Sequence, residues 1–339
     1  AYFALKLTGY SASHPALVKA RDFILAHGGM SQAQVFTRIF LAYFGQFPWR
    51  GVPAVPVELV LLPNWFPVNI YEMSSWARGT VVPLSMILAN PPLIRIPDER
   101  GVAELWQELP ERSNLEFPRS AQVISWENFF INVDRVLKFL GSSPVKPLRR
   151  SALRKAERWV LDHQDMNGGW GGIQPAMLNS VMALHTLGYP HDHPAMAKGI
   201  QAIEDFLMET GGHLLFQPCV SPVWDSVWAV KALLDSGVPN NHPVVVKAAD
   251  WIIDQQIFKT GDWQIKNPHL EPGGWAFEFA NDWYPDVDDS AVILYTLKRV
   301  QGLDEKKKDR ALARGLNWTL GMQSRNGSWG AFDTDNTLD

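Results

Sequence analysis

Short motifs recur along this chain, and their spacing constrains the fold more than any other feature. A His-Pro pair lies five residues after a glycine in three places, and each time a lysine follows five residues after the histidine. Proline is favoured at the first position of a helix, and periodic apolar residues follow each pair. A helix is therefore predicted to begin at each of the three copies, which are His14-Pro15, His193-Pro194 and His242-Pro243.

A second motif joins a tryptophan-bearing helix to a glycine turn. A basic residue precedes a tryptophan by four positions, a glutamine follows that tryptophan after five, and a Gly-x-Trp turn comes next. These helices contain charged residues, which is typical of helices on an outer surface. The copies align as Trp159–Gln164–Trp170, Trp251–Gln256–Trp263 and Trp318–Gln323–Trp329, and their tryptophans are interpreted as structural.

An apolar helix is expected after each turn. Asn or Asp followed by Ser opens each apolar stretch, and these residues are preferred N-caps. The predicted starts are Asn179-Ser180, Asp225-Ser226 and Asp289-Ser290. Polar outer helices that alternate with apolar inner helices predict an all-α fold, in which outer–inner pairs close into α/α barrels or toroids.

The remaining stretch and the two ends depart from the repeat. Residues 44–147 are rich in proline and are expected to be helical with long loops, with candidate helices around residues 76–88 and 126–140. The chain opens at the position of an inner helix and stops at Asp339, just after a Gly-x-Trp turn. We therefore expect an internal fragment of a longer protein, and we do not expect the isolated segment to be active.

Composition excludes several classes of protein. The net charge of −4 argues against a basic nucleic-acid surface, and a single cysteine excludes an internal disulfide or a cysteine-rich zinc site. No apolar run reaches the roughly 20 residues of a membrane span. Fifteen of the 339 residues are tryptophan, an excess that indicates a shared structural motif, an aromatic-lined cavity, or both.

Three carboxylates lie close together in one loop, at Asp286, Asp288 and Asp289, where an apolar helix is expected to begin. One interpretation is that Asp289 caps the helix and the others complement its dipole. The alternative is an acid, because closely spaced carboxylates cannot all ionise easily and one pKa must rise. A Phe/Trp-rich stretch at residues 273–279 precedes the loop and favours the acid. Such a group suits protonation of a very weak base, such as a carbon–carbon double bond.

Aromatic side chains provide the matching half of this chemistry. Ring faces stabilise a carbocation in a dry cavity by about 0.5–2 kcal/mol each, without trapping it as a nucleophile would. Core packing is the alternative for any single ring. The candidate rings are Trp76, Trp224, Phe277 and Phe332.

The Asp-Val-Asp-Asp loop at residues 286–289, together with the Gln…Gly-x-Trp repeats, resembles the class II triterpene cyclases, and within them the bacterial squalene–hopene cyclases. Segments 75–78, 170–175, 221–225 and 330–333 share the resemblance. It implies two α/α barrels around an apolar cavity, with one barrel inserted into the other. Residues 1–207 would then belong to the inserted barrel, and residues 208–339 to the catalytic barrel.

The resemblance also implies a reaction, the cyclisation of squalene to hopene and hopanol without a redox or metal cofactor. The implied roles are proton donor for Asp288, tuning of that donor for Asp286 and Asp289, stabilisation of cations for Trp224, Phe277 and Phe332, a cavity wall for Trp76, and the far end of the cavity for Gln174 and Pro175.

The implied partners are squalene and a membrane surface, with no nucleic acid. The protein is expected to be peripheral and monotopic on the cytoplasmic face of the bacterial cell membrane, and homodimer formation is left open. Two departures from the family pattern stand out: Asn179 replaces an aromatic residue of some members, and a family histidine that contacts the acid falls beyond Asp339.

Two other classes of protein remain as alternatives. A glycoside-active α/α barrel also combines aromatic residues and carboxylates, but it needs two carboxylates on opposite walls, about 5–9.5 Å apart. The clustering of the three aspartates in one loop argues against it. The other alternative is a non-catalytic or differently specific α/α barrel that binds a lipid or a glycan, in which these aspartates only cap a helix.

Overall fold

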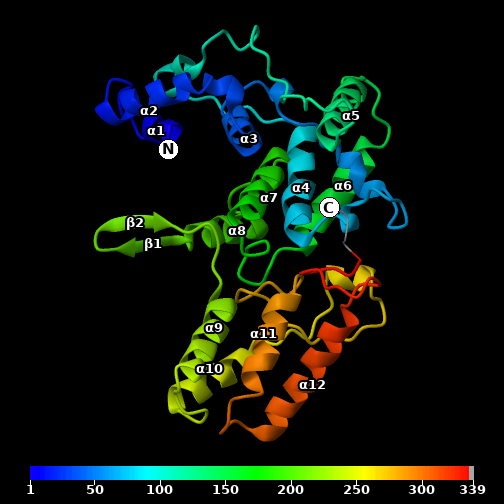
Figure 1. The fold of residues 1–339 in the computed structure, drawn as a ribbon. Helices are drawn as coiled ribbons and strands as arrows, with labels where there is room; N and C mark the ends of the chain where they lie inside the picture. Colours follow the sequence, from blue (N-terminus) through cyan, green and yellow to red (C-terminus); the bar gives the residue numbers. More distant parts are fainter. Residues whose placement is uncertain (336–339) are drawn as a thin grey trace. The chain divides into compact units, whose positions relative to one another are not determined.

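A computed structural model describes residues 1–335, and Figure 1 shows its elements along the chain. The residues form two compact units, of which the first comprises Ala1–Pro56 and Ile87–Pro147. Its elements are α1 (Tyr2–Leu7), α2 (Pro15–Ala26), η1 (Gly29–Gln32), α3 (Val35–Tyr43), η2 (Trp49–Gly51), η5 (Asp98–Arg100), η6 (Ala103–Leu105) and α5 (Trp126–Gly141), where η denotes a 3-10 helix.

The second unit comprises Val57–Met86 and the chain from Leu148 onward. It contains most of α4 and the repeated helices, with one two-stranded antiparallel hairpin between them. Its elements are η3 (Val57–Leu61), η4 (Ile70–Glu72), α4 (Ser75–Ala89), α6 (Arg149–Asp162), α7 (Gln174–Thr186), α8 (Pro194–Glu204), β1 (Leu207–Thr210), β2 (His213–Phe216), α9 (Pro222–Asp235), α10 (Pro243–Asp254), η7 (Asp262–Ile265), α11 (Val287–Leu297) and α12 (Glu305–Gly321).

The His-Pro motifs begin helices, as predicted. Proline is the first residue of α2, α8 and α10, and the preceding histidine is the N-cap in each case. The ring nitrogen Nδ1 accepts a hydrogen bond from the backbone N–H two residues on, at 3.2–3.3 Å. Each histidine thus satisfies a donor that the first turn of a helix leaves unpaired.

The glutamine–tryptophan motif ties each outer helix to the loop that follows it. The indole N–H of Trp170 donates to the carbonyl of Val160 at 2.7 Å, and the side chain of Gln164 donates to the carbonyl of Gly168 at 2.9 Å. Small residues make room for the ring, since a Cβ on Gly199 would come within 2.7 Å of Trp170. The motif is therefore a structural clamp.

The second copy of this motif differs from its predicted alignment, in which Trp263 was the clamp residue. The indole N–H that contacts the outer helix in the second copy belongs to Trp275, which donates to the carbonyl of Ile252, and Gln256 donates to the carbonyl of Gly273. The glutamine and the glycine are 17 residues apart here, against 4 in the other two copies. An insertion separates them, and Trp263 lies on η7 within that insertion.

The inner helices begin earlier than expected. Asn179 and Asp225 lie inside α7 and α9, which start at Gln174 and Pro222. The N-cap of α11 is Asp286 rather than Asp289, because the carboxylate of Asp286 accepts the backbone N–H of Asp289 at 2.7 Å. Prolines in the first turn of α7 and α9 explain the earlier starts there, since proline suits a position whose N–H has no helical partner.

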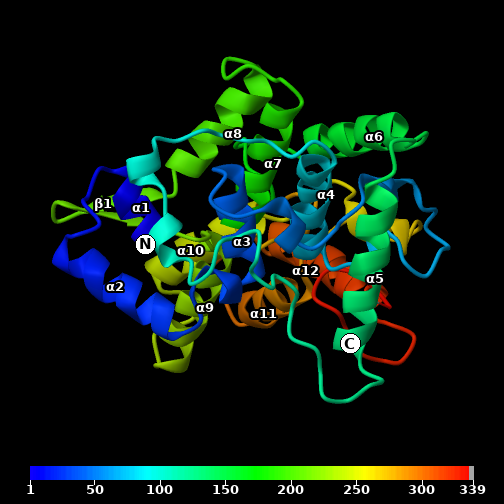
Figure 2. The same ribbon diagram turned by 90° about the horizontal axis from the view of Figure 1, so that it is seen from above.

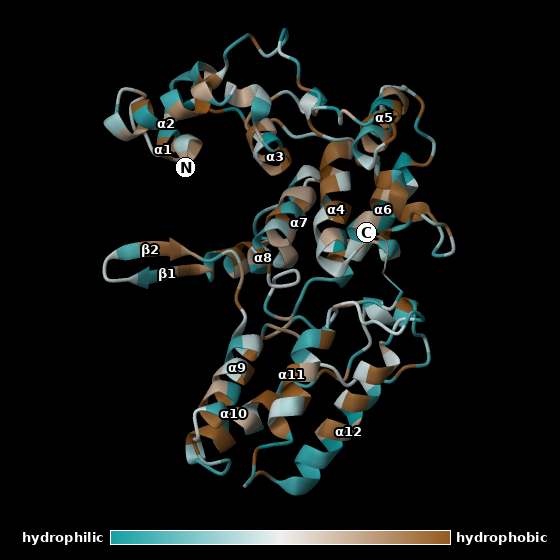
Figure 3. Cartoon of the chain, viewed as in Figure 1, coloured by the Kyte–Doolittle hydropathy of each residue, from teal (hydrophilic) through white to brown (hydrophobic). Residues whose placement is uncertain are grey.

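The inner and outer helices share a continuous core. Helix α9 packs on α10 and α11, and α11 packs on α12, as both views of the ribbon show (Figures 1 and 2). Buried Val227, Ile252, Ile293 and Leu297 meet there around Trp275, which is wholly buried. The beginning of α12 is hydrophilic and appears teal in Figure 3, in agreement with an outer position.

The predicted all-α class agrees with this architecture. Helices α4 and α5 match the predicted stretches 76–88 and 126–140 to within one residue at either end. Most of residues 44–147 otherwise form 3-10 turns and loops, as expected. The predicted division into residues 1–207 and 208–339 differs from the two compact units and stays a prediction.

Candidate active site

The loop that bears the three aspartates is fixed by hydrogen bonds at both ends of its backbone. The N–H of Asp286 donates to the carbonyl of Trp275 at 2.9 Å, and the N–H of Trp275 donates to Oγ of Ser290 at 2.9 Å. The hydroxyl of Ser290 in turn donates to the carbonyl of Asp286 at 2.7 Å. The first turn of α11 is therefore locked to the end of the glutamine–tryptophan clamp.

Two of the three carboxyl groups are buried, and their pKa values are raised. Burial, followed by the adjacent side chain of Asp289, raises the pKa of Asp286 well above its usual range. Burial also raises the pKa of Asp289, to about 6, and the hydrogen bond to Asp286 opposes this only in part. The pair holds a proton more readily than ordinary aspartates do, as expected for carboxyl groups that share one site.

Asp288 is the exposed member of the group. It is the second residue of α11, so its carboxylate lies beside the N-terminal N–H groups of that helix. A helix N-terminus is a favourable place for negative charge. Of the three carboxyl groups, Asp288 is the one that an outside molecule can reach.

Three of the four candidate rings come together. Trp76, at the start of α4, lies 5.6 Å from Phe277 and 5.8 Å from Phe332 between ring centroids. The interplanar angles are 69° and 43°, so edges and faces of the rings meet. We call Trp76, Phe277 and Phe332 the aromatic group.

Backbone hydrogen bonds connect the aromatic group to the aspartate loop and to α9. The N–H of Val287 donates to the carbonyl of Ala331, the neighbour of Phe332, at 2.8 Å. The carbonyl of Phe277 accepts the N–H of Val223 at 3.1 Å. Two of the three rings therefore belong to segments that are bonded to the first turn of α9 or α11.

The other predicted site residues lie on α9 and at the start of α7. Trp224 is half-buried on α9 and has an edge contact with Trp228, at 5.5 Å. Gln174 and Pro175 are half-buried at the start of α7. Trp76 lines a small hollow with Ile173, the residue before them. Asn179, the departure from the family pattern, is buried and donates to the carbonyl of Thr80 at 3.3 Å, which gives it a structural contact with α4.

Sequence reasoning missed two buried acids beside the aromatic group. Glu278 follows Phe277 directly and is 3% exposed, and neither of its carboxylate oxygens accepts a hydrogen bond from residues 1–335. Burial raises its pKa to about 7, and the nearby N–H groups of Phe279 and Ala280 offset only part of the shift. Burial, and then the charge of Glu278, also raise the pKa of Asp165 well above its usual range. The sequence signal that could have found Glu278 is that it is the one charged residue within the Phe/Trp-rich stretch at residues 273–279.

Glu278 should make the stability of the protein fall as the pH rises from about 4.5 to 7. Its pKa is raised in the folded state, so the proton binds more tightly there, and this contribution is full at low pH and lost through pH 7. We expect Glu278→Gln to remove about 2–3 kcal/mol of the decrease in the free energy of unfolding over this pH range. Thermal unfolding midpoints at pH 5 and pH 8 measure it.

The matched control is Glu209→Gln, on the exposed strand β1. It should leave the pH dependence as in the unmodified protein. A Glu278→Gln protein whose midpoint falls between pH 5 and pH 8 as much as the unmodified one does would show that Glu278 is ionised throughout this range.

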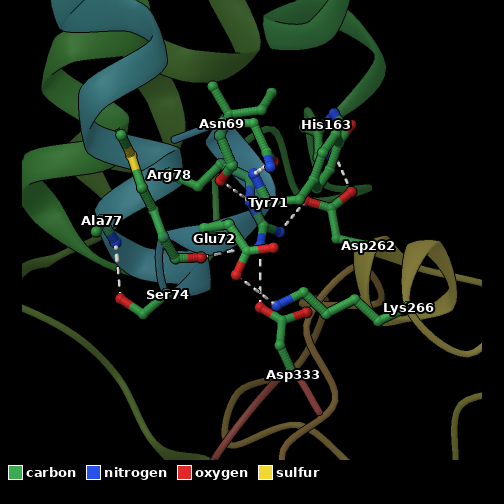
Figure 4. A network of polar contacts seen from close by, with 12 residues as sticks. Asn69, Tyr71, Glu72, Ser74, Ala77, Arg78, His163, Asp262, Lys266 and Asp333 are labelled. Atoms are coloured by element: carbon green, nitrogen blue, oxygen red, sulfur yellow. Dashed lines mark hydrogen bonds and ion pairs between the residues drawn. The ribbon is translucent and has the colours of Figure 1, made fainter. Parts of the chain in front are cut away.

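A second missed group surrounds Arg78, the one charged residue of α4 (Figure 4). Its guanidinium is wholly buried and forms ion pairs with Asp262, at 2.5 Å, and with Asp333, at 2.9 Å. Burial opposes the charge of Arg78, but the two carboxylates outweigh it and raise its pKa further. The ion pairs join residues that are 184 and 255 positions apart.

Comparison with known proteins identifies relatives of the chain. The family model of the squalene-hopene cyclase N-terminal domain matches residues 1–212, and that of the C-terminal domain matches residues 220–339. The squalene–hopene cyclases of Alicyclobacillus acidocaldarius and Zymomonas mobilis are 42% and 40% identical, over 100% and 99% of this chain. Dammaradiene synthase of Dryopteris crassirhizoma is 40% identical over 99%. The matches confirm the predicted family and its class of α/α-barrel fold.

The matched proteins are longer than this chain. It covers 53% of the Alicyclobacillus protein, 52% of the Zymomonas protein and 49% of the Dryopteris protein. The chain thus spans about half the length of the curated relatives it matches.

Proposed function

Because this chain belongs to the squalene–hopene cyclase family, we propose that the whole protein cyclises squalene to hopene and hopanol after protonation by Asp288. One observation supports this most strongly: backbone hydrogen bonds join the aspartate loop to Ala331, at 2.8 Å, and to Trp275, at 2.9 Å. Ala331 precedes Phe332 and Trp275 lies two residues before Phe277, so both bonds lead to the aromatic group. A proton donor and cation-stabilising rings thereby share one framework.

The first step is transfer of the Asp288 proton to a terminal double bond of squalene. A tertiary carbocation forms, and the carboxylate left behind lies at the N-terminus of α11, which stabilises its charge. Asp286 and Asp289 share a proton more readily than ordinary aspartates, so they place less negative charge beside the new carboxylate. They tune the acid without contacting the substrate.

The following steps move the positive charge along the folded substrate as rings close. Trp76, Phe277 and Phe332 offer aromatic faces and edges without a strong nucleophile. We propose the same role for Trp224 on α9. Each face is worth about 0.5–2 kcal/mol to a nearby cation. The rings therefore delay loss of a proton until cyclisation is complete.

The reaction ends at the far side of the cavity, beside Gln174 and Pro175. Loss of a proton from the last cation gives hopene, and addition of water gives hopanol. The proton gained at the start is released at the end, so the conversion to hopene is an isomerisation. Neither electrons nor a transferred group enter the balance, and we propose no redox or metal cofactor.

We also propose that the protein is monotopic, with α5 on the cytoplasmic face of a bacterial membrane. No helix within residues 1–335 is long and apolar enough to cross a bilayer. Helix α5 exposes a stripe of large apolar side chains, with Trp126 71% and Leu140 59% exposed, and Phe129 and Val136 between them. Aromatic and aliphatic side chains of such a helix bury themselves at the lipid boundary, where squalene dissolves.

Trp126→Ser combined with Leu140→Ser should release the whole protein from lipid vesicles. Removal of two large apolar side chains costs about 3 kcal/mol of burial or more, so vesicle affinity should fall at least roughly a hundredfold. Cosedimentation with anionic vesicles measures this. Val244→Ser, which removes an exposed apolar side chain from outer helix α10, is the control and should bind as before. Equal binding of all three proteins would rule out α5 as the membrane surface.

Incubation of the whole protein with squalene, followed by chromatography of the extracted products, tests the activity. The proposal expects a pentacyclic hydrocarbon with a smaller amount of its hydrated alcohol. The Dryopteris relative is named dammaradiene synthase at similar identity, so another cyclised triterpene is the second candidate. Recovery of unchanged squalene would favour a non-catalytic lipid-binding barrel.

A further inference from the structure

One ion pair joins the two chain segments that bear Trp76 and Phe332. Arg78 lies two residues after Trp76 on α4, and Asp333 follows Phe332 directly, with 2.9 Å between Nη2 of Arg78 and Oδ2 of Asp333. We propose that Arg78 and Asp333 are a positioning pair that holds the Phe332 ring against Trp76, an inference that rests on the proposed function. In that position the ring stabilises the carbocation of the cyclising substrate until ring closure is complete.

Arg78 is a rigid point of attachment. Its Nε donates to the carbonyl of Ile70 at 2.9 Å, its Nη2 donates to the carbonyl of Met73 at 3.1 Å, and its Nη1 donates to Oδ2 of Asp262 at 2.5 Å (Figure 4). The side chain is 0% exposed. Because the planar guanidinium makes all these bonds in fixed directions, it can hold Asp333 in only one place.

Arg78 keeps a second carboxylate partner, Asp262, when Asp333 is changed. Oδ1 of Asp262 lies 2.9 Å from Nε2 of His163, and Nδ1 of His163 lies 2.8 Å from the carbonyl of Trp159. Asp262 therefore contacts both His163 and Arg78, and it remains a partner of Arg78 when Asp333 is changed. A variant of Asp333 therefore removes one attachment and leaves the rest of the network in place.

The residues directly before and after Phe332 are each attached to another segment. One is the hydrogen bond from Val287 to the carbonyl of Ala331, and the other is the ion pair of Asp333. The first leads to the aspartate loop and the second to α4. Loss of the second removes the direct link to α4. The next residue but one, Thr334, is held by Asn267 at 2.8 Å and not by α4, so the ring can tilt away from the 5.8 Å contact with Trp76.

A neighbouring ion pair joins nearby segments without touching the ring. Lys266, just after η7, lies 3.0 Å from Glu72 at the end of η4, and both side chains are partly exposed. Figure 4 shows it beside Arg78. Glu72→Gln removes the ion pair between η4 and the residue after η7 but leaves the Arg78–Asp333 pair in place. An effect of Asp333→Ala that Glu72→Gln does not share is therefore due to the position of Phe332 and not to a general weakening of this region.

The test compares Asp333→Ala, Asp333→Asn and Glu72→Gln with Phe332→Ala in the whole protein, by chromatography of the products from squalene. We expect Asp333→Ala to raise the share of partly cyclised products roughly fivefold or more, and we expect Phe332→Ala to do the same. A fivefold change corresponds to about 1 kcal/mol in the partition between ring closure and proton loss. Asp333→Asn keeps an oxygen acceptor for Arg78 and should restore part of the normal distribution. Glu72→Gln should leave the distribution unchanged.

A second readout does not depend on catalysis. With 4-fluorophenylalanine at position 332, the ¹⁹F signal reports the position of this ring over Trp76. Asp333→Ala should shift the signal and Glu72→Gln should not. If Asp333→Ala folds but leaves both the signal and the products unchanged, or shifts the signal without changing the products, the positioning role is wrong. If the unmodified protein does not convert squalene, the proposed function fails, and the ¹⁹F signal alone still decides whether the pair positions the ring.

Discussion

Asp288→Asn is expected to abolish cyclisation in the whole protein while its fold is retained. The asparagine amide cannot donate an acidic proton, and positioned acid catalysis of this kind contributes roughly a hundredfold to ten-thousandfold or more. We therefore expect turnover of squalene to fall at least about a thousandfold. The side chain is exposed, so the substitution buries no unpaired polar group and the unfolding midpoint should stay the same.

Asp250→Asn is the matched control for this experiment. Asp250 lies on the outer helix α10 and pairs with Lys307 at 2.7 Å, away from the loop. It should keep full activity. An Asp288→Asn protein that turns over squalene at close to the normal rate would show that another group donates the proton, and buried Asp286, whose pKa is raised, is then the first to examine.

Phe277→Ala is expected to release partly cyclised products rather than simply slow the reaction. Phe277 lies 5.6 Å from Trp76, and its removal takes one face from the wall that stabilises an intermediate cation. A loss of about 0.5–2 kcal/mol changes the partition between ring closure and proton loss roughly two- to thirtyfold. Gas chromatography of the products measures the ratio directly.

Phe279→Ala provides the comparison, because this ring lies two residues further along and is 62% exposed. It should yield the normal products. If Phe277→Ala makes only the complete pentacycle, at whatever rate, the ring serves in packing and does not stabilise a cation.

The repeat architecture could be predicted from the sequence because its contacts are local. His193 caps the helix that begins at the next residue, and Gln164 bonds a carbonyl four residues on. The same local reasoning assigned Trp263 to the clamp in place of Trp275, because the insertion contains its own Gly-x-Trp. It also placed the start of α11 at Asp289, since either aspartate suits an N-cap by residue type alone.

The surroundings of the aspartate loop depend on contacts between distant residues. The sequence singled out Trp76, Phe277 and Phe332 individually, but their meeting follows from the packing of α4 against two later loops. Arg78 and Asp333 are 255 residues apart, so nothing in either local sequence announces their pairing. Glu278 was missed for the same reason, since its burial depends on segments such as Gly172, where a Cβ would come within 2.7 Å of it.

Isotope labelling tests proton-initiated cyclisation most directly. The whole protein is equilibrated in D₂O and given squalene, and the hydrocarbon product is analysed by mass spectrometry and NMR. Asp288 then holds a deuteron, so the product should contain one deuterium, located in the first ring where the terminal double bond was protonated. A cyclised product formed in D₂O without deuterium in that ring would contradict initiation by a protein acid.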